Sequence, residues 1–135
     1  MKNAFTMIEL IWVIVILGIL AAVAIPKLAA TRDDAHIAQG RADVMTIRSG
    51  IISERQARMF RGDTSYTATL GGANPLFDTV VQGGIRPSSK SGGWTRTDDT
   101  HYDFHLNAVA VTFEYNTTTG NFFCDTTAGT AQQQA

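Results

Sequence analysis

A long apolar run near the N-terminus, with one carboxylate at its start, constrains this chain more than any other feature. Residues 10–25 carry no side chain that forms a strong hydrogen bond except the indole of Trp12, and Glu9 stands immediately before them. A carboxylate close to the apolar core of a bilayer costs up to about 3 kcal/mol, so it needs a cationic partner. Cleavage between Ala4 and Phe5 would create such a partner, a new α-amino group four residues before Glu9.

This arrangement resembles the N-terminal segment of type IV prepilins and the related pseudopilins. In that family a short basic leader ends in a small residue, a phenylalanine begins the mature chain, and a glutamate follows four residues later. The resemblance implies a leader of residues 1–4, cleavage after Ala4 by a prepilin peptidase and N-methylation of Phe5. It also implies that Glu9 and Phe5 act in assembly. The family usually carries glycine before the cut, whereas this chain has Ala4.

The chain of 135 residues supports one globular domain, and much of its hydrophobicity precedes Pro26. Gly18 and Pro26 fall where the family usually has a glycine and a proline, and we predict a helix kink there, because proline lacks a backbone donor. The kink is either a simple one that packing tolerates or a place where the helix can bend or melt locally. The predicted organisation begins with a leader at residues 1–4 and a transmembrane or filament-core helix at 5–26. A globular region that includes the amphipathic half of the helix follows at 27–125, and a flexible tail at 126–135 ends the chain.

The helix is predicted to continue to about Arg61. An apolar stripe recurs there at spacings of three, four and seven, and comprises Ile37, Val44, Ile47 and Ile51. Gly62 can take the left-handed conformation that ends a helix. Glycine pairs punctuate the following stretch, 62–93, and predict loops with one or two short strands or turns.

Three or four antiparallel strands are predicted between about Tyr102 and Asp125. Apolar residues alternate over 101–106 and again, with opposite parity, over 109–115, which predicts a turn or a bulge near Asn107. The fold class is therefore α+β: a long N-terminal helix, apolar in its first half and amphipathic in its second, packed on a small antiparallel sheet as in pilins. The stripe should face that sheet.

Two other interpretations of the N-terminus remain open. One is an ordinary signal peptide cleaved before Ile25, since Ala22-Val23-Ala24 matches the small-x-small pattern, although Glu9 and the length of the apolar run count against it. The other is a plain transmembrane anchor, because residues 5–25 are long enough to span a bilayer.

The charge pattern points away from nucleic acid. The formal net charge of −1 argues against a general nucleic-acid binder. Arg41, Arg48 and Arg55 repeat every seven residues and share one side of the predicted helix. They form either a solvated face or a contact with the acidic heads of neighbouring subunits.

The single cysteine, Cys124, cannot form an intramolecular disulfide, whereas many type IV pilins have one. We expect Cys124 to be buried in a strand.

No enzyme active site is evident in the sequence. The serines lack nearby histidines, and no glycine-rich phosphate loop is present. His101, Asp103 and His105 share a face of a strand but spread over about 13 Å, too far to bind one ion. Asp98, Asp99 and Asp103 form a weak calcium candidate in a loop entering that strand, with a solvated acidic turn as the alternative. Some major pseudopilins bind calcium in a C-terminal loop, but no motif here aligns to that site.

The resemblance implies a structural, non-enzymatic subunit of a type IV pilus-like filament, with a pseudopilin of type II secretion favoured. The alternatives are a type IV pilin for adhesion or motility, a competence pseudopilin for DNA uptake, and a membrane-anchored enzyme. The implied partners are other copies of the chain, the prepilin peptidase, the inner-membrane assembly platform and minor pseudopilins. The implied location is the bacterial inner membrane, with the N-terminus cytoplasmic and the globular region periplasmic, and then a periplasmic or extracellular filament.

Overall fold

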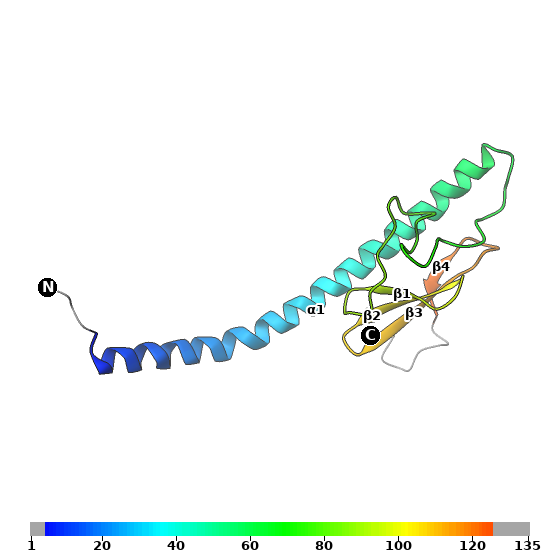
Figure 1. Ribbon diagram of the computed structural model, residues 1–135. Coiled ribbons are helices and arrows are strands. Elements are labelled where there is room, and N and C mark those ends of the chain that lie inside the picture. Colours follow the sequence, from blue (N-terminus) through cyan, green and yellow to red (C-terminus); the bar gives the residue numbers. More distant parts are fainter. Residues whose placement is uncertain (1–4, 126–135) are drawn as a thin grey trace. The chain divides into compact units, whose positions relative to one another are not determined.

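The computed structural model describes residues 5–125, and of residues 23–30 it describes the backbone alone. It contains one helix, α1 (Met7–Met59), followed by four strands, β1 (Trp94–Arg96), β2 (His101–Leu106), β3 (Val109–Tyr115) and β4 (Phe122–Cys124) (Figure 1). The predicted α+β class is confirmed in its coarse form, an N-terminal helical part followed by an antiparallel sheet that contacts the helix. The chain divides after Ala35 into two compact units, which we describe separately.

The first unit contains the apolar part of α1. Every described side chain from Phe5 to Ala22 is exposed. Within the part of the chain that the structure describes, no helical stretch is both long and apolar enough to cross a membrane. The last residues of the predicted segment 5–26 fall in the range 23–30, for which the structure describes no side chains. The predicted leader, 1–4, and the predicted tail, 126–135, lie outside the described residues. The helical backbone runs through Pro26, so proline does not end α1.

The second unit begins at His36, and we call its described part the head. The part of α1 that follows Ala35 carries the predicted stripe, and Val44, Ile47 and Ile51 are buried in the core while Ile37 is half-buried. The predicted orientation of the stripe is confirmed for Val44, Ile47 and Ile51, because these three side chains belong to one core cluster with buried residues of the strands. The strands and their loops therefore cover one side of the amphipathic helix.

The end of α1 is a Schellman motif. The Asp63 N–H donates to the Arg58 carbonyl over 3.0 Å, and the Gly62 N–H donates to the Met59 carbonyl over 3.0 Å. Gly62 has a φ of 87°, a left-handed value that glycine reaches without steric cost. The predicted role of Gly62 is confirmed, although regular helix stops at Met59 rather than Arg61.

The sheet is a simple antiparallel meander in the order β1-β2-β3-β4 (Figure 1). β2 and β3 form a hairpin in which Leu106 pairs with Val109, so the turn contains only Asn107 and Ala108. Asn107 has a φ of 54°, as the tight turns of hairpins require. The change of parity in the sequence is therefore a turn and not a bulge.

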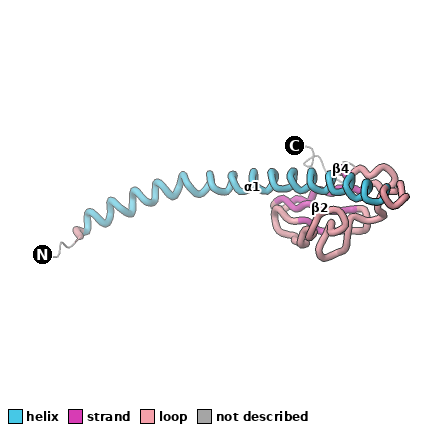
Figure 2. The backbone as a smooth tube through the Cα atoms, turned by 90° about the horizontal axis from the view of Figure 1, so that it is seen from above, coloured by secondary structure: helices cyan, strands magenta, loops and turns pink. Residues whose placement is uncertain are grey.

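The core lies between α1 and one face of the sheet, and Figure 2 shows the C-terminal part of the helix running along the strands. Trp94 is fully buried at its centre, with ring contacts to Phe77, Phe104, Phe113 and Phe122. The sequence did not predict β1 as a strand. The stretch 62–93 also does more than connect elements, because Leu70, Leu76 and Phe77 from it are fully buried.

Candidate functional site

The first candidate site is the start of α1, where Glu9 lies in the first turn. The Glu9 N–H lies 3.3 Å from the Thr6 hydroxyl oxygen, which accepts from it, and 3.1 Å from the Thr6 carbonyl. Thr6 therefore caps the helix, and Thr6-Met7-Ile8-Glu9 has the spacing of a capping box. The favourable interaction of a carboxylate with the helix dipole gives Glu9 a local role in addition to any role in assembly.

No hydrogen bond or ion pair of the Glu9 carboxylate is found among residues 5–125. The side chain is exposed, and so are the large apolar side chains around it, including Phe5 at 79%, Ile8 at 61% and Trp12 at 63%. Exposed apolar surface of this extent on a folded chain marks a surface that another molecule or a lipid phase covers. The site is therefore a carboxylate set in an uncovered apolar helix.

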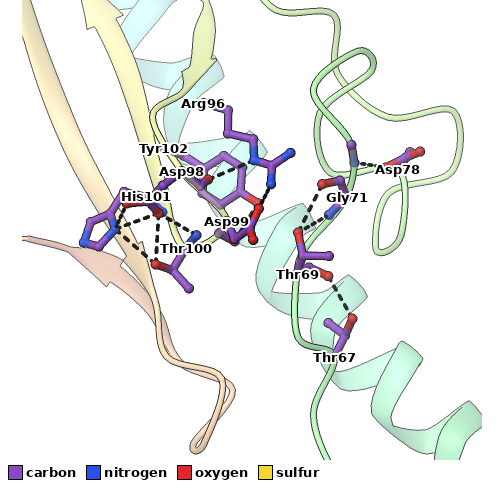
Figure 3. Close-up of polar contacts among 11 residues, drawn as sticks. Thr67, Thr69, Gly71, Asp78, Arg96, Asp98, Asp99, Thr100, His101 and Tyr102 are labelled. Carbon is purple, nitrogen blue, oxygen red and sulfur yellow. Dashed lines mark hydrogen bonds and ion pairs between the residues drawn. The ribbon is translucent and has the colours of Figure 1, made fainter.

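The second candidate site is the loop between β1 and β2, where the calcium candidates lie. Asp98 organises this loop: its Oδ1 atom accepts hydrogen bonds of 2.8 Å from the backbone N–H groups of Thr100 and His101 (Figure 3). The same carboxylate lies 2.9 Å from Nδ1 of the His101 imidazole. Asp98 is thus the side chain that closes the turn into β2.

The other two aspartates have different partners. Asp99 forms an ion pair with Arg96 on the preceding strand (Figure 3). Asp103 accepts hydrogen bonds from the hydroxyls of Thr97 and Thr112, at 2.9 and 2.7 Å. The three carboxylates do not gather into one group of possible metal ligands, so the geometry of this loop is that of the acidic turn.

The contacts of Asp98 and His101 shift the ionisation of both groups. The Thr100 N–H, and then His101, stabilise the ionised carboxylate and lower the pKa of Asp98. The hydrogen bond from Asp98 stabilises the imidazolium and raises the pKa of His101, with a smaller contribution from the charge of Glu114. The imidazole is thereby fixed with Nδ1 toward Asp98.

A third group of polar residues was not predicted from the sequence. His101, Glu114 and Asp125 each place one possible ligand atom within 4.8 Å of the others, and it is the one such group among the described residues. His101 pairs with Glu114 across β2 and β3, and Asp125 directly follows β4. Alternation along each strand shows which of its residues share a face of the sheet. It does not show which residues of different strands lie side by side, because that depends on the pairing register.

The arginines of the seven-residue repeat do not share one environment. The Arg48 Nε atom donates over 2.9 Å to the Phe122 carbonyl. Arg55 lies over the Tyr66 ring, 4.2 Å from its centroid, and also bonds to the Tyr66 hydroxyl. Of these three arginines, only Arg41 is both exposed and without a hydrogen bond or ion pair to another described residue. Two of the three arginines therefore hold the head together.

Cys124 is half-buried, where a buried position was expected. It borders an apolar groove of about 460 Å³ between α1 and the sheet, which Val44, Phe104 and Val111 also line. Partial burial raises the pKa of the Cys124 thiol, which disfavours the reactive thiolate. The groove belongs to the helix–sheet packing and carries no group of catalytic side chains.

Comparison with protein-family models, with curated proteins and with solved structures gives no match for this chain.

Proposed function

We propose that this chain is a structural subunit of a type IV pilus-like filament, specifically a pseudopilin of a type II secretion system. The observation that carries the proposal is the exposed apolar part of α1 with Glu9 in its first turn, in the same helix that supplies the stripe of the head. A surface of this kind needs lipid or other copies of the helix around it.

The spacing of Ala4, Phe5 and Glu9 supports the same proposal, because it is the spacing of the prepilin processing segment. In the proposed mechanism the subunit waits in the inner membrane with its N-terminus in the cytoplasm. A prepilin peptidase removes residues 1–4 and methylates Phe5. The apolar helices then pack into the filament core, with Gly18 and Pro26 allowing local bending, and the heads form the outer layer.

Assembly follows from a single interface that is repeated with a rise, which generates an open helix rather than a closed ring. Glu9 pairs with the amino group of Phe5, within one subunit or between neighbours, and thereby selects the axial register. Growth of a short filament from the inner-membrane platform, together with minor pseudopilins, pushes cargo toward the outer membrane.

The absence of a second cysteine beside Cys124 supports a pseudopilin over an adhesive pilin, since many pilins close a loop with a disulfide. A retractable pilin and a competence pseudopilin are the alternatives within the same family. Genomic neighbours separate them: a secretin with secreted cargo, a retraction ATPase, or DNA-uptake proteins.

Processing tests the proposal. The chain is co-expressed with a prepilin peptidase, extracted from membranes, and analysed by intact mass and N-terminal sequencing. We expect the mature chain to begin at methylated Phe5, and Ala4→Gly, which restores the usual family residue, to be processed at least as completely. A mature chain that begins at Ile25 would indicate an ordinary signal peptide and overturn the proposal.

A further inference from the structure

The outer face of the sheet carries a group of side chains that the filament proposal does not use. Strand alternation places Tyr102, Phe113 and Phe122 on the core side, and it places the residues next to them on the opposite face. His101 begins β2 and lies directly across from Glu114 in β3. Glu114 in turn pairs with Phe123, two residues before Asp125, so all three polar side chains share the outer face.

One imidazole nitrogen and two carboxylates thus come within 4.8 Å of one another from three adjacent segments, and all three residues are half-buried. Backbone pairing fixes their spacing: the Asp125 N–H donates over 2.8 Å to the Thr112 carbonyl and continues the pairing beyond β4. Two carboxylates held this close repel each other, and a bound cation relieves that repulsion.

Asp98 adds the second feature of a built metal site. It lies 2.9 Å from Nδ1 of His101, so the neutral ring donates its Nδ1–H to a carboxylate and leaves Nε2 as the lone-pair donor. This carboxylate–histidine arrangement is what orients imidazole ligands in zinc sites. The calcium candidate Asp98 therefore supports a ligand instead of being one.

We propose that His101, Glu114 and Asp125 bind one divalent transition-metal ion, Zn²⁺, on the outer face of the sheet. A set of one imidazole and two carboxylates suits zinc, with water in the fourth position, whereas calcium prefers six to eight oxygen ligands. Tetrahedral bonds of about 2.1 Å bring ligand atoms to about 3.4 Å from each other, a closure within reach of half-buried side chains.

The bound ion links β2, β3 and the end of β4. β4 has three residues and pairs only with β3, so the metal adds a side-chain cross-link where the backbone pairing is shortest. The bound ion thereby fastens the C-terminal end of the sheet. The inference does not depend on filament assembly, because it concerns the folded chain alone.

The test uses the full chain in detergent, without a histidine tag, after removal of metal with a chelator. Co²⁺ is titrated first, because its visible absorption reports coordination number, and Zn²⁺ is then added as the tighter-binding competitor. We expect one Co²⁺ per chain with the intense bands of four-coordination, full displacement by one Zn²⁺, and no displacement by Ca²⁺ at the same concentration.

Matched variants locate the site. Glu114→Gln keeps the shape of the side chain and removes its charge, and it should weaken Zn²⁺ binding at least tenfold, as should His101→Ala. Asp98→Asn should weaken binding by about 10- to 100-fold through loss of ring orientation. His105→Ala is the control: His105 lies on the same face of β2 but bonds to Thr95, and its loss should leave the affinity within twofold.

A readout that needs no variant is imidazole NMR of the wild-type chain, in which the first equivalent of Zn²⁺ should shift His101 and leave His105 unchanged. Bound Zn²⁺ should also raise the unfolding midpoint of the wild type and not that of Glu114→Gln. Absence of Zn²⁺ binding, binding that Glu114→Gln leaves intact, or preferential binding of Ca²⁺ would each overturn the proposal.

Discussion

The indole Nε1–H of Trp94 donates a hydrogen bond of 3.0 Å to the carboxylate of Asp43. Trp94 is fully buried and begins β1, whereas Asp43 lies on α1 beside Val44 of the apolar stripe. The bond joins the helix and the first strand at the centre of the core, and it satisfies the one polar atom of the largest buried side chain.

Removal of that acceptor should destabilise the head. Asp43→Ala leaves the buried indole N–H without a partner, and we expect it to lower the free energy of unfolding by about 1–3 kcal/mol. Asp43→Asn retains an acceptor oxygen and should cost less. Urea unfolding followed by Trp94 fluorescence, in a Trp12→Phe background, measures the difference. Equal stability of Asp43→Ala and the parent chain would show that the bond contributes nothing.

Gly50 should tolerate no side chain. A Cβ atom there would lie 2.0 Å from the carbonyl oxygen of Val80, a backbone atom that cannot move aside cheaply. We expect Gly50→Ala to lower the free energy of unfolding by about 1–3 kcal/mol, despite the better helix propensity of alanine.

Gly18→Ala is the matched control for that substitution. A Cβ at Gly18 meets no atom within 4 Å, so the stability of the head should not change. If both alanine variants unfold at the same urea concentration as the parent, the close approach of α1 to the loop at Val80 does not exist in solution.

The Asp98–His101 pair makes stability depend on pH in a defined window. The pKa of His101 is raised, so its contribution is complete below the ordinary imidazole value of about 6.5 and is lost as pH rises through the folded pKa. The pKa of Asp98 is lowered, so its contribution is complete above the ordinary carboxyl pKa of 3.8 and is lost as pH falls through the lowered value. Both contributions are therefore present together between about pH 4 and 6.5.

Imidazole NMR in metal-free buffer checks this prediction. The pKa of His101 should lie above the ordinary value, and Asp98→Asn should bring it down. Because Asp98 is exposed and His101 is only half-buried, solvent screens their interaction and the effect on unfolding should be small. A pKa of His101 that is the same in Asp98→Asn and in the parent chain would contradict the predicted contact.

The helix and the hairpin could be predicted from local patterns. The stripe that ends at Ile51 repeats at helical spacing, and Gly62 marks the left-handed residue after the helix, so both features depend on nearby residues alone. The opposite parity on the two sides of Asn107 likewise reports a two-residue turn. Such features need no knowledge of tertiary contacts.

The remaining features depend on distant partners. β1 has three residues, too short for an alternating pattern, and forms because Trp94 pairs with Phe104 and packs in the core. Phe77 lies among glycine-rich turns that are typical of solvated loops, yet it is fully buried. The group of His101, Glu114 and Asp125 is set by the register of three segments, which no local pattern specifies.

The role of Glu9 in assembly provides the central test of the proposed function. Two properties of this side chain can be separated: its size and shape, which glutamine keeps, and its charge, which only glutamate provides. Leaving one member of a buried ion pair unpaired typically costs about 3–5 kcal/mol, so the pairing with the Phe5 amine should depend on the charge.

The decisive measurement is filament yield by electron microscopy in cells that overexpress the assembly machinery, with a cleavage assay on the same samples. We expect the parent chain to form filaments, and Glu9→Ala and Glu9→Gln to be cleaved after Ala4, inserted in the membrane and folded, but to form few filaments or none. Normal filaments from Glu9→Ala would contradict a role for Glu9 in assembly, and normal filaments from Glu9→Gln alone would assign that role to the shape of the side chain instead of its charge.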